Sequence, residues 1–199
     1  FFLGEKDIDK NLNNNVIANG GFRVQPHYIK RIENEQGGVI VEDEFPRACD
    51  LRCMQKARAN QSSALMAPRV ISSGNDYIMT QALRGVIQHG TGRAALVLKR
   101  TDLAGKTGTT NDKRDAWFAG FNSKVACITW VGYDDLGGLY EYGSKAALPI
   151  WIDYMRDVLA NQPESTMPMP KNIALARIDP KSGLLAEADQ KDAIFDEYP

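Results

Sequence analysis

The residues best suited to chemistry lie in the run 102–111. Side chains alternate along a strand, so on a strand here the hydroxyls of Thr107 and Thr109 share one face. Beside them, the cationic Lys106 can neutralise a substrate carboxylate, and Gly108 lets an extended substrate backbone lie close alongside. A backbone N–H just beyond Gly108 can donate into an oxyanion hole. This pattern favours acyl transfer.

The main rival reading is a phosphate-binding loop, because Gly105, Lys106 and Thr107 also match the end of that motif. The phosphate-binding motif requires a further glycine five positions before Gly105, but position 100 is arginine. The residues that follow also do not open a helix. Neither the Gly-x-Ser-x-Gly elbow nor the His-Glu-x-x-His zinc motif occurs in the sequence. His27 and His89 stand alone, which favours structural or solvent-exposed roles for both.

An antiparallel sheet should position these residues. Three strands are predicted, over about 103–110, 115–121 and 125–133, with a tight turn between the last two. Their short connections imply antiparallel neighbours, since a parallel pair needs a crossover of roughly a dozen residues. An earlier hairpin is predicted from the segments 22–32 and 39–41.

Two helices should cover this sheet. The first is predicted over 76–88, with Ser73 as its N-cap and Gly90 as its stop. The second should begin at a cap on Ser144, which puts Pro149 in its first turn. Its apolar residues form one wide face that should pack across the sheet. They are Ala147, Leu148, Ile150, Trp151, Tyr154, Met155, Val158 and Leu159.

The ends of the chain differ from this centre. Residues 1–15 are predicted to be loop. After Asn161 the composition shifts to a linker-like stretch with three closely spaced prolines. A further strand is predicted over 173–178, followed by a turn.

Composition narrows the classes of function. The 199 residues are 43% hydrophobic and 25% charged, which is typical of a folded domain. A net charge of −1 argues against a general nucleic-acid binder. No apolar run reaches the roughly 18–20 residues of a membrane span, and no signal peptide is visible. Because the chain starts at Phe1 rather than at Met, we expect it to be a piece of a longer chain.

The three cysteines do not form a disulfide framework. Cys49 and Cys53 are equally compatible with one disulfide and with two free thiols. Zinc is disfavoured, because a structural site needs about four ligands and only two distant histidines could complete it. Cys127 lies in an apolar strand and should be a small core residue.

The run 102–111, with 115–121 just after it, resembles the lysine–threonine–glycine region of class A penicillin-binding proteins. Three further segments share the likeness: 18–24, 67–80 and 85–94. The resemblance covers roughly 16–160 and implies the α+β transpeptidase fold, an antiparallel sheet with covering helices. It makes 1–160 the C-terminal part of a transpeptidase domain and 161–199 an extension.

Enzymes of that family cross-link peptidoglycan stem peptides through a serine ester, and β-lactams acylate them. The resemblance implies that Lys106 is catalytic and that Thr107, Gly108 and Thr109 bind substrate, both threonines on its carboxylate. The Thr109 N–H would serve the oxyanion hole. No metal or organic cofactor is implied. The implied location is the periplasm, with attachment to the bacterial inner membrane through a segment outside this chain.

The nucleophile of that family is missing here, because no serine is followed three positions later by lysine. Ser73 and Asn75 match the family's Ser-x-Asn motif only literally, since Ser73 is expected to cap a helix. We therefore expect the serine to come from the upstream remainder of the same domain, which becomes an obligatory partner. The alternative is a non-catalytic cell-wall binding or scaffold module that retains the fold. A serine β-lactamase fits less well, because of the proline-containing tail.

Overall fold

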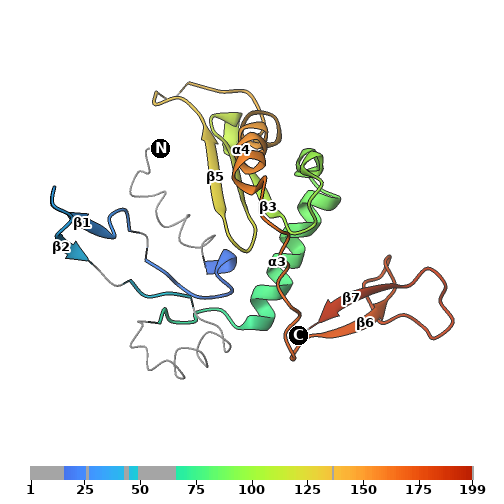
Figure 1. Ribbon diagram of the computed structural model, residues 1–199. Coiled ribbons are helices and arrows are strands. Elements are labelled where there is room, and N and C mark those ends of the chain that lie inside the picture. The colour runs from blue at the N-terminus through green and yellow to red at the C-terminus, as the bar shows by residue number, and fades with distance from the viewer. Residues whose placement is uncertain (1–15, 26, 43–44, 49–65, 136, 199) are drawn as a thin grey trace.

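The computed structural model describes residues 16–25, 27–42, 45–48, 66–135 and 137–198 (Figure 1). The loop predicted over 1–15 and the pair Cys49 and Cys53 lie outside the described residues. Within the described residues, no helix is both long enough and apolar enough to cross a membrane.

The centre of the molecule is a three-stranded antiparallel sheet in the order β3-β4-β5. Its strands are β3 (Ala104–Thr109), β4 (Ala116–Phe121) and β5 (Ala126–Val131). The side chain of Asn122 closes the turn between β4 and β5, where its Oδ1 accepts a hydrogen bond from the backbone N–H of Val125 (2.9 Å). The predicted antiparallel α+β fold is confirmed.

Helix α4 (Gly143–Leu159) packs on β4 and β5. The prediction that Ser144 caps it was wrong: the N-cap is Tyr142, and no side chain caps the helix. Contact with the sheet determines this start, because a Cβ at Gly143 would lie 2.5 Å from the carbonyl oxygen of Gly108. Only glycine lets the first turn of α4 approach β3 so closely.

The earlier start of α4 moves Pro149 into the second turn, not the first turn that we predicted. Pro149 is exposed, so the carbonyl that loses its helical partner can bind water. The apolar face is also narrower than predicted. Ile150, Tyr154 and Val158 are exposed, and they follow one another at helical spacing along one side of α4.

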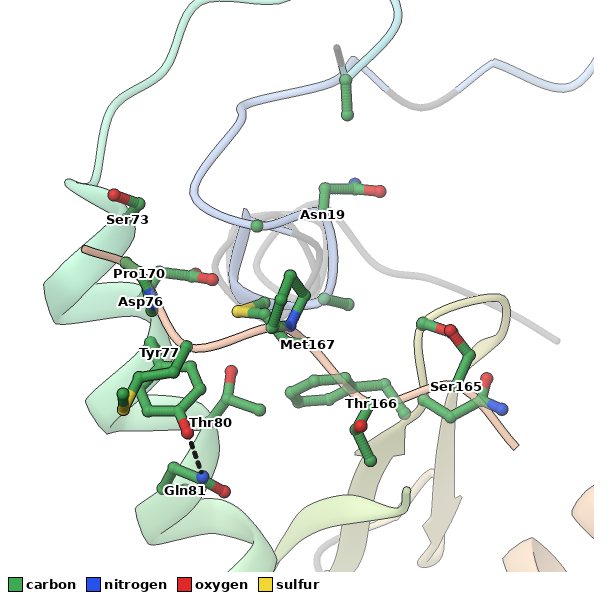
Figure 2. A pocket seen from close by; sticks show the side chains of 18 of the residues that line it. Asn19, Ser73, Asp76, Tyr77, Thr80, Gln81, Ser165, Thr166, Met167 and Pro170 are labelled. Atoms are coloured by element: carbon green, nitrogen blue, oxygen red, sulfur yellow. Dashed lines mark hydrogen bonds between the residues drawn. The ribbon is translucent and has the colours of Figure 1, made fainter. Parts of the chain in front are cut away.

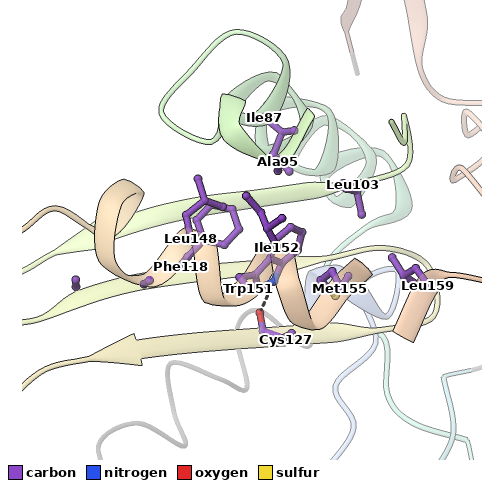
Figure 3. Close-up of a cluster of buried hydrophobic side chains, with 12 residues drawn as sticks. Ile87, Ala95, Leu103, Phe118, Cys127, Leu148, Trp151, Ile152, Met155 and Leu159 are labelled. Carbon is purple, nitrogen blue, oxygen red and sulfur yellow. Dashed lines mark hydrogen bonds between the residues drawn. The ribbon is translucent and has the colours of Figure 1, made fainter. Parts of the chain in front are cut away.

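Trp151 lies at the centre of the hydrophobic core (Figure 3). Its ring meets Phe118 edge-on at 4.9 Å between centroids, and its Nε1 donates to the carbonyl of Cys127 (3.1 Å). A Cβ at Gly120 would lie 2.6 Å from the indole, so this glycine makes room for the ring. Cys127 is buried, as predicted, and burial raises the pKa of its thiol to about 11.

Helix α3 (Ser73–Gln88) packs against β3. Its N-cap is Ser72 and not Ser73 as predicted: the backbone of Ser72 is extended, and its Oγ accepts a hydrogen bond from the N–H of Asn75 (3.2 Å). At the other end, the N–H of Gly90 donates to the carbonyl of Val86 in the last turn (3.0 Å). The helix ends at Gln88, just before Gly90, as we predicted.

Shorter elements complete the structure: β1 (Arg31–Glu33), β2 (Val39–Glu42), β6 (Ala174–Ile178), β7 (Ile194–Tyr198), and the 3-10 helices η1 (Arg93–Leu98) and η2 (Asn111–Lys113). The strand predicted over 173–178 is confirmed as β6. In the first hairpin only the end of the predicted arm 22–32 is a strand. Phe22 bridges to Arg69 instead, whose guanidinium lies 4.1 Å from the centre of the phenyl ring.

Candidate active site

The backbone of β3 is hydrogen-bonded to β4 at alternate residues. Just past the strand ends, the N–H of Thr110 donates to the carbonyl of Asp115 (3.1 Å), so these two residues form a hydrogen-bonded pair. Such pairs alternate with non-bonded pairs in an antiparallel ladder. The continuous register therefore makes Gly108 and Lys106 the next residues whose backbone groups face β4.

Thr107 and Thr109 occupy the non-bonded positions between them. Their N–H and C=O groups point away from β4, toward the outer edge of β3, which has no strand partner among the described residues. This edge can accept an extended peptide as an added strand. The outward N–H of Thr109 is also suitably placed to donate to a developing oxyanion.

The backbone of Lys106 faces β4, but its side chain is exposed and reaches the outer edge. Its Nζ donates to the carbonyl oxygen of Thr107 (2.8 Å) and lies 3.5 Å from the hydroxyl oxygen of the same threonine. The ammonium group thus folds back along the outer edge of β3. There it brings a positive charge to the open strand edge.

Thr91 is a residue that the sequence analysis missed. It lies in the turn between α3 and η1, and its Oγ1 is 2.8 Å from the Oγ1 of Thr107. Thr91, Thr107 and Lys106 therefore form a continuous chain of polar groups. The only local signal was a threonine between Gly90 and Gly92, and nothing in that pattern indicates that the turn reaches β3.

The hydroxyl of Thr109 has a different neighbour. It accepts a hydrogen bond from the backbone N–H of Gly143, the first residue of α4 (3.2 Å). The N-terminus of a helix carries a partial positive charge. Thr107 and Thr109 are thus held by different elements, one by the turn that follows α3 and the other by the start of α4.

The start of β3 is anchored by Asp102, whose side chain is completely buried. Arg100 binds both carboxylate oxygens (2.9 and 2.8 Å), and the side chain of Asn122 and the backbone N–H of Ser165 also donate to it (3.3 and 3.2 Å). Burial alone would raise the pKa of Asp102, but these hydrogen bonds, led by that of Arg100, hold it below its usual value. Strand β3 is therefore tied to the β4–β5 turn and to the segment after α4.

The other residues considered from the sequence lie in structural settings. Ser73 and Asn75 are in the first turn of α3. His27 stacks on Phe45 with 3.6 Å between ring centroids, and His89 is the C-cap of α3. Among the described residues there is no group of three or more His, Cys, Asp or Glu that could hold a metal ion.

The antiparallel sheet, its covering helices and the lysine–threonine–glycine edge strand define a transpeptidase domain. Residues 14–156 match the family described as "Penicillin binding protein transpeptidase domain", and the chain belongs to that family. Within the family it corresponds to part of the transpeptidase domain of class A proteins of the 1A type.

Three relatives support this assignment. Penicillin-binding protein 1A of Pseudomonas aeruginosa is 40% identical over 92% of this chain and 26% of its own length. The Neisseria meningitidis serogroup B protein of the same name is 40% identical over 79% of this chain and 18% of its own. A crystal structure of penicillin-binding protein 1A from Haemophilus influenzae superposes with a TM-score of 0.81 at 31% identity, covering 94% of this chain and 31% of that one. The chain therefore spans only a minor part of these relatives.

Proposed function

We propose that this chain supplies the lysine–threonine–glycine wall of a peptidoglycan DD-transpeptidase active site. The hydroxyl of a serine outside this chain attacks the carbonyl of a D-alanyl–D-alanine bond, releases D-alanine and becomes acylated. An amine of a second stem peptide then attacks the ester, forms the cross-link and frees the serine. β-Lactams acylate the same serine. The site works at the periplasmic face of the inner membrane, to which a segment outside this chain attaches the protein.

The observation that carries this proposal is the outer edge of β3. Thr107 and Thr109 turn their backbone groups outward there, beside the exposed ammonium of Lys106. In the proposed complex, the substrate lies along this edge as an added strand. Lys106 and the two threonine hydroxyls bind its carboxylate, Gly108 admits its backbone, and the Thr109 N–H stabilises the oxyanion. A donor of this last kind typically contributes roughly 100- to 1000-fold in rate.

A second candidate function is a non-catalytic module that binds the cell wall through the same edge. One specific observation favours it: none of the serines in the 199 residues is followed by a lysine three positions later. The polar chain from Lys106 to Thr91 argues only against a module that serves purely as a scaffold, because such a module has no use for an exposed cation on the strand edge.

A chimera tests the proposal directly. In it, this chain replaces the matching part of the Pseudomonas aeruginosa relative, so that the rest of the domain comes from that protein. We expect the chimera to be labelled by a fluorescent penicillin and Lys106→Ala to slow labelling by about 100-fold or more. Lys191→Ala removes an exposed lysine on the C-terminal extension and should leave the rate unchanged. A folded chimera that is not labelled would favour the non-catalytic module.

A further inference from the structure

A cavity of about 970 Å³ lies between α3, the β4–β5 turn and the segment 165–172 (Figure 2). None of the described residues that line it belongs to the run 106–109. Its volume is within the range of about 300–1,000 Å³ that is typical of pockets for small molecules.

Two polar side chains of α3 are buried in the wall of this cavity and have no hydrogen-bond partner among the described residues. Asp76 is completely buried, and neither of its carboxylate oxygens has a hydrogen-bond partner among the described residues. The hydroxyl of Thr80 is likewise buried and unpartnered. The two residues are four positions apart, so they are neighbours on one face of the helix. Figure 2 shows both on the side of α3 that faces the segment 165–170.

A buried carboxylate without hydrogen bonds is strongly unfavourable unless a cation compensates its charge. The charge of Arg69 acts on Asp76 and opposes the effect of burial on the Asp76 pKa. However, the Nη1 of Arg69 donates to the carbonyl oxygens of Gly20 (2.6 Å) and Ile71 (3.4 Å). Its guanidinium is therefore committed to the loop and does not bond to the carboxylate.

The remaining walls determine what kind of cation fits. Much of the lining is apolar or aromatic: Phe22, Tyr77, Phe121, Met167 and Met169. A metal ion is usually held by several His, Cys, Asp or Glu side chains, and the described part of the chain has no group of three or more of these residues. An ammonium group needs only a few acceptors for its three donors. An apolar body attached to it would be buried against the aromatic and methionine side chains.

We propose that this cavity is a binding site for an organic ammonium ion. The ammonium group lies between the carboxylate of Asp76 and the hydroxyl of Thr80, and its apolar body packs against Phe22, Tyr77 and Met167. Ligand binding at this site involves no step of the transpeptidase reaction, so its test is independent of the test of the proposed function.

Binding should strengthen as Asp76 ionises. Burial raises the pKa of Asp76 to about 6, with Arg69 opposing. The other charged residues that line the cavity are Arg84, Asp102 and Lys171. Asp102 is neutralised by Arg100, and Arg84 donates to the carbonyl of Thr101 (3.1 Å) and the side chain of Gln81 (2.7 Å). Lys171 is exposed and does not bond to Asp76. Among the described residues that line the cavity, Asp76 is therefore the acidic group that remains to be paired.

The probe is 2-phenylethylammonium, with 2-phenylethanol as its uncharged match and potassium chloride as the inorganic cation. Binding to the full 199-residue chain is followed at pH 8 by the carboxyl carbon-13 signal of Asp76 and by the melting temperature. We expect the amine to shift both and the alcohol and potassium to shift neither. Asp76→Asn should weaken amine binding at least about tenfold, the usual scale of a lost charged hydrogen bond.

The control variant Asp134→Asn removes an exposed carboxylate and should bind like the wild type. Thr80→Val gives a second test, with weakened binding, in case Asp76→Asn does not fold. The proposal is overturned if the amine leaves the wild-type Asp76 signal unmoved, or if it acts equally on the Asp76→Asn protein. It is also overturned if the alcohol or potassium produces the same effect as the amine.

Discussion

The hydroxyl oxygens of Thr91 and Thr107 lie 2.8 Å apart, and this contact joins the turn after α3 to the strand that carries Lys106. The same Thr107 oxygen is 3.5 Å from the Lys106 ammonium. Thr91 is thus one hydrogen bond away from the residue to which we assign the substrate carboxylate. Its role would be to position Thr107, since only Thr107 reaches the lysine.

Replacing Thr91 with valine should therefore reduce the rate of penicillin labelling of the chimera by about fivefold, the equivalent of one ordinary hydrogen bond. Thr91→Ser keeps the hydroxyl and should restore most of the rate. A structural defect alone would lower the melting temperature of both variants without separating their labelling rates. Equal rates for the valine and serine variants would contradict the positioning role.

The anchor of β3 should be sensitive to the loss of one charge. Asp102→Asn leaves the nearly buried guanidinium of Arg100 without its counter-ion, so we expect a loss of roughly 3–5 kcal/mol in the free energy of unfolding at pH 7. Asp153→Asn breaks an exposed pair with Arg156 and should cost less than about 1 kcal/mol. Urea denaturation measures both. Similar small losses would contradict the anchor.

The same ion pair has a defined pH dependence. Because the folded state lowers the pKa of Asp102, its contribution is complete above the ordinary value of 3.8 and is lost as the pH falls through the lowered value. The difference in stability between wild type and Asp102→Asn should therefore be constant near neutral pH and shrink in acid. A difference that grows in acid would have the wrong sign.

Asp76 should show the opposite behaviour. Its folded-state pKa is raised from 3.8 to about 6, so its ionisation destabilises the fold as the pH rises through that interval. A shift of this size corresponds to roughly 3 kcal/mol. Asp76→Asn removes the effect, and its advantage in stability over wild type, measured in urea without amines, should appear between pH 4 and 6. A constant difference across this interval would count against the buried, ionising carboxylate.

Two glycines make a matched test of the core. A Cβ at Gly120 would lie 2.6 Å from the indole of Trp151, so Gly120→Ala should destabilise the protein by about 1–3 kcal/mol. A Cβ at Gly85, inside α3, meets nothing within 4 Å, and Gly85→Ala should stabilise by roughly 0.5–1 kcal/mol through helix propensity. Thermal unfolding of the two variants should shift in opposite directions, and shifts of the same sign would refute the packing of Trp151 over β4.

The sequence predicted the elements well where short-range patterns determine them. The three strands and the β4–β5 turn follow from apolar runs separated by turn residues, and their antiparallel order follows from the short connections. Both predicted N-caps were wrong, by one residue at α3 and by two residues at α4. Ser72 and Ser73 are equally good caps by type, and only the extended backbone of Ser72 decides between them. Gly143 begins α4 because of its contact with β3, which no local rule predicts.

The candidate site was predictable only in part. The sequence alone indicated four candidate residues, because they are consecutive and form a known motif: Lys106, Thr107, Gly108 and Thr109. The residues that hydrogen-bond to this run come from elsewhere in the chain and could not be predicted from it. Thr91 lies in the turn after α3 and Gly143 at the start of α4. The burial of Asp76 could not be predicted from the sequence either. An acidic residue in the first turn of a helix is normally exposed, and its charge interacts favourably with the helix dipole.

The most direct test of the central claim is to find where a penicillin adduct forms. This chain is mixed with the separately expressed part of the Pseudomonas aeruginosa relative that lies outside the matched region, and each polypeptide is weighed intact after incubation with the drug. We predict an adduct on the relative's polypeptide, formed only when this chain is present and much reduced with Lys106→Ala. An adduct on this chain by itself would show that one of its own serines is the nucleophile, and would contradict the account of a site completed from outside.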